Sequence, residues 1–279
     1  MSEQHIPLTA IVLSHNEAQN LSRCLSALRS CAEVIVVDDG SDDGSPDMAR
    51  KHGARVVEHP FTSFADQRNW ALHSAGCGFA WTLHLDADEV MTVPALEEIR
   101  VRIRSMSENQ VGYLARKIML NDRWLKYSAD YPVYVARLVH RRGPRFEMGG
   151  HGEIINAPTS DAVFLDEPML HYAFSKGWPD WYRKHDRYAA DEAARLLATA
   201  GQGTGPLLWS ADPVQRRRVL RSLSYRIPAR PLFRFLYQYV WRRGFLDGVP
   251  GYQFARAMAR YEAMINQHQR RLRREATEQ

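Results

Sequence analysis

Short apolar runs alternate with segments of helical spacing over the first 85 residues. Residues 8–13 (LTAIVL) form an apolar, β-branched run, and residues 16–28 then carry apolar side chains three and four positions apart. The same order predicts strands at 34–37, 55–58 and 80–85 and helices at 46–52 and 64–75. Strands that alternate with helices at this spacing predict right-handed βαβ units and an α/β fold with a mostly parallel sheet.

The periodicity weakens after Pro94, where strand-like pieces appear at 112–120 and 133–140. A helix is expected at 178–197, and a connection rich in Gly and Pro follows at 199–213. We expect one α/β domain over residues 1–205, in halves 1–110 and 111–205, and a helical, basic region over 206–279.

The charge of the chain is unevenly distributed. The whole chain of 279 residues has a formal net charge of +5, but residues 212–279 contain fifteen Arg against five Asp and Glu. The first 211 residues are therefore acidic. A basic, aromatic tail suits anionic lipid headgroups or nucleic acid, and charge alone does not separate these two partners.

Membrane spans and disulfides are not expected from this sequence. It contains no apolar run of the ~18 residues that a membrane span needs, and its first seven residues lack the apolar core of a signal peptide. We therefore expect a cytoplasmic protein. Cys24, Cys31 and Cys77 show no C-x-x-C spacing, which favours core thiols over a disulfide framework or a zinc site.

Polar clusters follow three of the predicted strands, at residues 14–17, 38–41 and 86–89. In open parallel sheets, ligands bind beyond the carboxyl ends of the strands. The three clusters are therefore expected to converge on one crevice.

Two acidic motifs in these clusters carry candidate chemistry. Asp86 and Asp88 end an apolar strand in LHLDADEV, and paired carboxylates there can hold a divalent ion together with a diphosphate. An isolated D-x-D is more often a solvated turn, but its place after a buried-type strand favours the metal. The second motif, VIVVDDGSDDGS at 34–45, fits either a contact to a nucleotide base or ribose or a turn that caps the next helix.

Four motifs taken together resemble one family. S-x-N-E at 14–17, VVDDGS at 36–41, QRN at 67–69 and LDADE at 85–89 are similar in order and spacing to the family 2 inverting glycosyltransferases, which have the GT-A fold. YPVYVARLVHRRGPRF at 131–146, HGE at 151–153 and FLDGVPG at 245–251 resemble the branch with lipopolysaccharide-core and capsule glycosyltransferases.

The resemblance implies a nucleotide-sugar donor, most often a UDP-sugar, a Mn²⁺ or Mg²⁺ ion, and a lipid-linked or lipopolysaccharide- or capsule-type saccharide acceptor. Residues 1–110 would bind the donor and residues 111–205 the acceptor. Asp88 would coordinate the metal, and Asp86 would contact the ribose or a metal-bound water as its partner in the pair. The resemblance also implies further donor-binding residues. Ser14, Asn16 and Glu17 would form the pocket wall, and Asp39 would contact the base, with Asp38 supporting the turn. Gln67 and Arg68 would lie near the base or diphosphate.

Inversion by direct displacement needs a general base on the acceptor hydroxyl. Glu153 is our candidate because it falls in the acceptor half, beside glycine and the imidazole of His151. Relatives in this branch have His and Glu adjacent, whereas this chain inserts Gly152. Asp130 and Asp166 are alternative bases, and a solvated loop carboxylate is the alternative for Glu153.

The tail combines aromatic and basic residues at helical spacing. Residues 231–244 read PLFRFLYQYVWRRG, a composition that suits an interfacial amphipathic helix. We expect Phe233, Tyr239, Trp241, Arg242 and Arg243 to contact an anionic membrane, which would make the protein peripheral on the inner face of the plasma membrane. Packing against the catalytic domain is the alternative.

Other classes of protein fit the sequence less well. A sugar nucleotidyltransferase would open with a Gly- and Lys-rich phosphate loop, and the first strand is not followed by one. A nucleic-acid-binding protein would not have an acidic first 211 residues, so no nucleic acid partner is expected. An inactive relative would be free to lose Asp39, Asp86 and Asp88, and all three are present.

Overall fold

The computed structural model describes residues 5–149, 152–199 and 229–277. The chain forms two compact units, residues 1–120 together with 131–175, and residues 121–130 together with 176–279. This division differs from the expected boundary at residue 205. The internal contacts group the helix after residue 175 with the C-terminal region, and residues 121–130 belong to that same unit.

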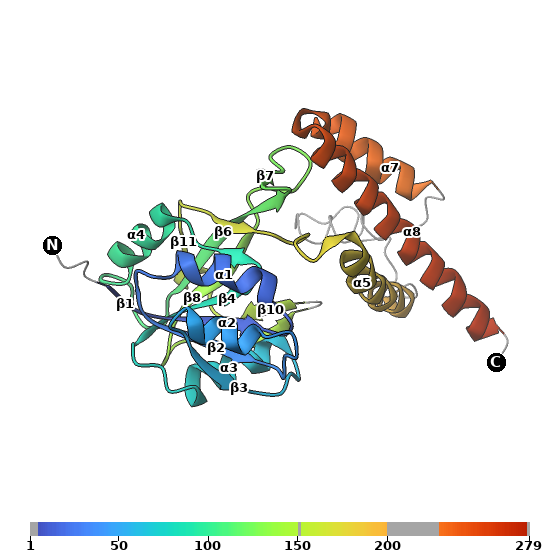
Figure 1. Ribbon diagram of the computed structural model, residues 1–279. Coiled ribbons are helices and arrows are strands. Elements are labelled where there is room, and N and C mark those ends of the chain that lie inside the picture. Colours follow the sequence, from blue (N-terminus) through green and yellow to red (C-terminus); the bar gives the residue numbers. More distant parts are fainter. Residues whose placement is uncertain (1–4, 150–151, 200–228, 278–279) are drawn as a thin grey trace. The chain divides into compact units, whose positions relative to one another are not determined.

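The first unit is built on one mixed sheet (Figure 1). Its parallel part has the order β3-β2-β1-β4, and β8 continues it in the antiparallel direction, followed by β6, β12 and β5. β11 pairs with β6 in the parallel direction. The strands are β1 (Ile6–Ser14), β2 (Cys31–Asp38), β3 (Arg55–Glu58), β4 (Trp81–Asp86), β5 (Glu89–Val90), β6 (Val111–Leu120), β8 (Tyr134–His140), β11 (Ala162–Phe164) and β12 (Met169–His171).

Helices cover both faces of this sheet. The largest hydrophobic core joins β1 and β4 to α1 (Ala18–Ala27), α2 (Ser45–Lys51) and α4 (Val93–Arg102). The opposite face is covered by α3 (Phe64–Ser74) and by the hairpin of β9 (Phe146–Gly149) and β10 (Gly152–Ile155). The predicted α/β class is confirmed, because apolar residues of the predicted strands line these cores.

The pairing of β6 with β8 contains a one-residue irregularity. Gly112 lies opposite Leu138, but the next residue of β6, Tyr113, lies opposite Ala136. Arg137 is therefore an extra residue in β8, which is the arrangement of a β-bulge. The two strands approach closely here, since a Cβ atom added to Gly112 would lie 2.7 Å from Cβ of Leu138.

The second unit is mainly helical. Its core joins α5 (Gly177–Thr199) to α8 (Val249–Thr277) through Ala189, Ala193 and Ile265. α7 (Arg230–Leu236) also packs on α8, and Arg230 forms an ion pair with Glu262 at 2.9 Å. Among the described helices, none is both long enough and apolar enough to cross a membrane.

A buried carboxylate organises the segment 121–130 within this second unit. Asp247, in a short 3₁₀ helix at Gly244–Asp247, accepts hydrogen bonds from the backbone N–H groups of Lys126, Tyr127 and Ser128. The FLDGVPG motif thus supplies the group that satisfies three consecutive donors. Gly248 separates the 3₁₀ helix from α8, and the two residues after Val249 lie in the first turn of α8.

We predict that Gly112→Ala lowers the free energy of unfolding by about 1–3 kcal/mol, because the added methyl group would overlap the side chain of Leu138 on the partner strand. Thermal or urea unfolding measures this loss. Gly78→Ala is the matched control, since the nearest atom to its added Cβ is a side-chain oxygen of Glu33 at 3.4 Å. Equal stability of both variants would contradict the close approach at Gly112.

Candidate functional site

The register of the parallel strands brings their carboxyl ends to one edge of the sheet. Ser14 at the end of β1 lies beside Asp38 of β2, and Leu13 lies beside Asp86 of β4. The three polar clusters predicted from the sequence therefore lie along the same edge, as expected for a ligand crevice in an α/β protein.

The turns after β1 and β2 are joined by hydrogen bonds. The backbone N–H of Asn16 donates to Oγ of Ser41 at 2.8 Å, and Oδ1 of Asn16 accepts from the N–H of Asp42 at 3.0 Å. The N–H of Glu17 donates to Oγ of Ser45 at 2.8 Å. These bonds hold the two turns in one fixed arrangement, which is what a preformed nucleotide pocket needs.

The two adjacent aspartates after β2 have different environments. Asp38 is buried and its carboxylate accepts from both the N–H and the hydroxyl of Ser41, so it supports the turn as expected. The Asp39 side chain is 27% exposed, and Nδ1 of His15 lies 3.5 Å from its Oδ2. Its Oδ1 accepts from the N–H of Phe61 at 2.7 Å. Of the two adjacent aspartates, Asp39 is thus more accessible than Asp38.

Arg68 and Gln67, expected to contact the donor, are both enclosed by the protein. Arg68 is 0% exposed, and its guanidinium donates to Asp86 at 2.7 Å and to Glu153 at 3.0 Å. Gln67 is buried and donates to the carbonyl of His59 at 2.9 Å. Both side chains are therefore held inside the protein, and their role in donor binding stays a prediction.

Arg137 forms a second bridge between the same carboxylates. It is almost fully buried at the β8 bulge and donates to Glu153 at 2.8 Å and to Asp86 at 3.2 Å. Two further bonds, at 2.8 and 2.9 Å, reach the two oxygens of Glu89. Arg137 is not among the site residues predicted from the sequence, although it lies within the YPVYVARLVHRRGPRF segment.

These ion pairs fix the charge states of the buried groups. Burial alone would raise the pKa of Glu153, but Arg68 and Arg137 outweigh it and hold that pKa below its ordinary value. Burial likewise opposes the charge on Arg137, while Glu89 and Asp86 raise its pKa above the ordinary value. Glu153 is therefore an ionised carboxylate at neutral pH.

His171 lies beside Asp88, with Nε2 of the imidazole 3.4 Å from Oδ2 of the carboxylate. The antiparallel pairing of β12 with β5 creates this proximity by placing His171 opposite Glu89. His171 is not among the site residues predicted from the sequence, because it lies 83 positions after Asp88 and no ligand spacing indicates their contact.

Asp88 and His171 fit a divalent ion that takes its other ligands from elsewhere. The described residues contain no group of three or more His, Cys, Asp or Glu side chains arranged to hold a metal. Each carboxylate oxygen of Asp86 already accepts from a guanidinium. Mg²⁺ and Mn²⁺ commonly complete their coordination with substrate phosphate oxygens and water, so two protein ligands suffice for a metal–diphosphate site.

The alternative bases lie in other surroundings. Asp166 is 87% exposed at its side chain and pairs with Arg102 of α4 at 3.5 Å. Asp130 belongs to the second unit, where it pairs with Arg242.

His151 lies outside the described residues. The three cysteines are buried thiols, as predicted.

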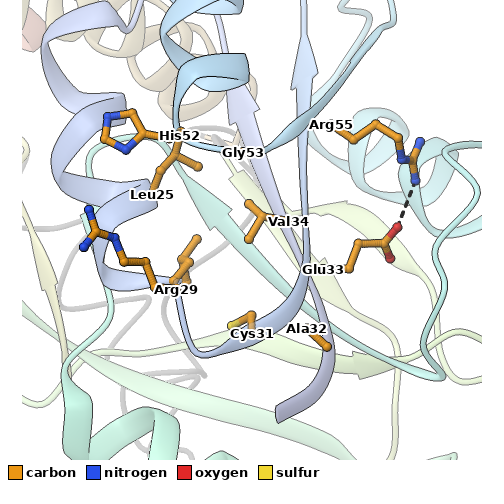
Figure 2. A pocket seen from close by; sticks show the side chains of 10 residues that line it. Leu25, Arg29, Cys31, Ala32, Glu33, Val34, His52, Gly53 and Arg55 are labelled. Atoms are coloured by element: carbon orange, nitrogen blue, oxygen red, sulfur yellow. Dashed lines mark hydrogen bonds and ion pairs between the residues drawn. The ribbon is translucent and has the colours of Figure 1, made fainter. Parts of the chain in front are cut away.

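A cavity of about 340 Å³ lies at the opposite edge of the sheet. It is formed by the start of β2, the start of β3 and the end of α1, and Figure 2 shows Arg55 and Glu33 paired at its rim. Because it lies at the amino ends of parallel strands, it is not part of the crevice that contains Asp39, Asp86 and Asp88.

The first unit is thus an α/β sheet with acidic side chains at the carboxyl ends of its parallel strands. Residues 9–153 match the family described as Glycosyl transferase family 2. The match covers more than half of the chain, so the protein belongs to this family, and its sheet flanked by helices is of the expected GT-A type.

Relatives with curated names match parts of the chain. The lipopolysaccharide core biosynthesis glycosyltransferase LpsC of Rhizobium meliloti is 31% identical over 113 residues, covering 39% of this chain and 41% of LpsC. An uncharacterized glycosyltransferase of Rickettsia bellii is 30% identical over 168 residues, covering 58% of this chain and 54% of that protein. The chain thus spans about half the length of the curated relatives it matches.

The solved structures that match the chain are more distant in sequence. The mannosyltransferase PcManGT of Pyrobaculum calidifontis, solved with GDP-Man and Mn²⁺, is 15% identical with a TM-score of 0.49, covering 95% of this chain and 87% of its own. TarS 1–349 of S. aureus is 15% identical with a TM-score of 0.41, covering 91% of each chain.

Proposed function

We propose that the protein is an inverting glycosyltransferase that moves a sugar from a UDP-sugar to a lipid-linked or lipopolysaccharide- or capsule-type saccharide. The observation that carries this proposal is the joining of Asp86 and Glu153 through two buried guanidinium groups, beside Asp88 at the carboxyl end of β4. Family membership supports the reaction class, and the name of the Rhizobium relative supports the class of acceptor.

The donor nucleotide would bind between the turns after β1 and β2. Asp39 would accept hydrogen bonds from the base, and the segment Ser14, Asn16 and Glu17 would form the pocket wall. The buried hydroxyl of Ser14, which has no hydrogen-bond partner among the described residues, supports this assignment, since such groups are usually satisfied. Gln67 and Arg68 would act through the groups that they hold.

A Mn²⁺ or Mg²⁺ ion would bind to Asp88 and His171, with Asp86 beside it as a contact to the ribose or to a metal-bound water. When bound, such an ion neutralises the developing charge of the diphosphate leaving group. The proximity of one carboxylate and one imidazole at the strand edge supports this site.

Glu153 would serve as the general base. Within the described residues, hydrogen bonds reach only its Oε1 atom, from both Arg68 and Arg137. The other oxygen of this ionised carboxylate would accept the proton of the acceptor hydroxyl while that hydroxyl attacks the anomeric carbon. The side chain is 12% exposed, so it is sheltered from bulk water.

We predict that the protein is stabilised by one class of nucleotide sugar in the presence of Mn²⁺. A panel of UDP-, GDP-, CMP- and TDP-linked sugars, each with and without Mn²⁺, should raise the melting temperature by about 5 °C for UDP-sugars at saturating ligand. Asp88→Asn should abolish the manganese-dependent part of this shift, because it removes a charged ligand. Asp166→Asn, at an exposed carboxylate paired with Arg102, is the matched control. Absence of a shift with every donor would contradict the proposed function and favour an inactive relative.

We predict that Glu153→Gln lowers the turnover number at least about 100-fold while donor affinity changes less than about threefold, because the amide cannot accept the proton. Release of UDP from the donor that binds in the panel measures turnover, and calorimetry measures affinity. Loss of donor binding in this variant would instead make Glu153 a donor-binding residue and not the base.

Membrane contact would come from an exposed apolar surface on the second unit, the tail surface. Its residues are Leu232, Phe233, Leu236, Tyr237, Val240, Trp241, Phe245, Leu246 and Val249, and Trp241 is 82% exposed. Arg243 is exposed beside them and would meet lipid phosphates. The protein would then lie peripherally on the inner face of the plasma membrane.

Two residues expected at this surface have other contacts. The guanidinium of Arg242 donates to the carbonyls of Tyr127 and Ala129 and pairs with Asp130. Tyr239 is half-buried against Phe235 and other aromatic rings. Phe233, Trp241 and Arg243 therefore carry the membrane proposal, and membrane contact by Tyr239 and Arg242 stays a prediction.

We predict that Phe233→Ser combined with Trp241→Ser weakens binding to vesicles of phosphatidylglycerol and phosphatidylcholine by at least about tenfold, since two large apolar side chains are lost from the interface. Vesicle co-sedimentation measures binding, and the hydrolysis of a soluble donor should not change. Val101→Ser, at an exposed apolar position of α4 in the first unit, is the control. Undiminished vesicle binding by the double variant would exclude the tail surface as the contact.

A further inference from the structure

Arg137 occupies a position that a regular strand would not provide. It is the extra residue of the β8 bulge, and its neighbours Ala136 and Leu138 keep their pairing with β6. Bulges redirect a side chain locally while the strand continues on both sides. The close approach of Leu138 to Gly112 lies at the same irregularity, so the pairing of β8 with β6 sets the position of Arg137 in the strand.

The guanidinium of Arg137 binds three carboxylates that come from different elements. Glu89 of β5 is fully buried and accepts two of its bonds, which anchors the guanidinium in the protein interior. Its other bonds to carboxylates reach Asp86 at the end of β4 and Glu153 in β10. One side chain therefore connects the metal-binding end of the crevice to the proposed base.

Arg68 of α3 approaches the same two carboxylates from another element. Both guanidinium groups donate to the same Oε1 atom of Glu153, at 2.8 and 3.0 Å. A carboxylate held through one oxygen by two rigid donors has its second oxygen fixed in direction. This arrangement gives an orientation to Glu153 that a single ion pair would leave variable.

We propose that Arg137 is a positioning residue, which holds Glu153 and Asp86 at a fixed separation and direction so that the base faces the acceptor hydroxyl. This inference rests on the proposed function, since it concerns the same site. Arg137 touches neither donor nor acceptor in this role and acts through Glu153. Misplacement of a reacting group by about 1 Å can cost on the order of 100-fold in rate.

Lysine is the informative replacement at this position. It preserves the positive charge among the buried carboxylates, but its single ammonium nitrogen cannot reproduce four bonds from three nitrogen atoms in one plane. Arg137→Lys should therefore retain donor and Mn²⁺ binding within about threefold. The turnover number should fall about 10- to 100-fold with little change in KM, because orientation and not binding is lost.

A double-mutant cycle with Glu153→Gln tests whether Arg137 acts through the base. If it does, adding Arg137→Lys to Glu153→Gln lowers the turnover number no further than Glu153→Gln alone. Arg55→Lys is the matched control, because Arg55 forms its ion pair with Glu33 at the opposite edge of the sheet (Figure 2) and should keep the wild-type turnover number.

Three results would contradict either the positioning role of Arg137 or the proposed function on which it rests. Unchanged turnover in a folded Arg137→Lys protein, or additive losses in the cycle, would overturn the positioning role while leaving the proposed function intact. Absence of donor binding by the wild-type protein would instead overturn the proposed function. If Arg137→Lys fails to fold, a double variant with Glu89→Gln and Arg137→Gln replaces it, since this variant removes one negative and one positive charge. Adding these two substitutions to Glu153→Gln should again lower the turnover number no further than Glu153→Gln alone.

Discussion

The site depends on two guanidinium groups buried among three carboxylates at the carboxyl end of β4. Arg68 and Arg137 together neutralise most of the charge of Asp86, Glu89 and Glu153, and removal of one partner from such a buried set typically costs about 3–5 kcal/mol. The cluster also joins α3, β4, β8 and β10, which lie far apart in the sequence. Its integrity therefore links the stability of the first unit to the geometry of its crevice.

The sequence predicted the parallel half of the sheet well, because buried parallel strands appear in a sequence as continuous runs of apolar residues. The strand at Arg55–Glu58 has the predicted bounds, and α3 ends one residue before its predicted end. Asp86 and Asp88 could be found for the same reason, since the end of such a strand marks the crevice. Residues 111–205 contain several strands of only two to four residues and mixed pairing, which leave a weaker pattern in the sequence.

The residues that sequence reasoning missed owe their positions to tertiary structure. His171 reaches Asp88 because β12 pairs with β5, and Arg137, the extra residue of β8, reaches Asp86 and Glu153. The hydrophobic periodicity of the sequence cannot reveal either contact, since each depends on how a strand pairs with its partner. The boundary near residue 205 was drawn from Gly and Pro content, whereas contacts with α8 decide the grouping of α5.

Asp247 ties residues 126–128 to the C-terminal region of the second unit, which has a practical consequence for shortened versions of the protein. A chain cut after Ser175 would keep the family 2 motifs and the whole first unit. It would nevertheless retain residues 121–130 without the carboxylate that satisfies their amides. This orphaned segment would be a site for proteolysis and aggregation, so a soluble catalytic fragment should replace it with a short polar turn.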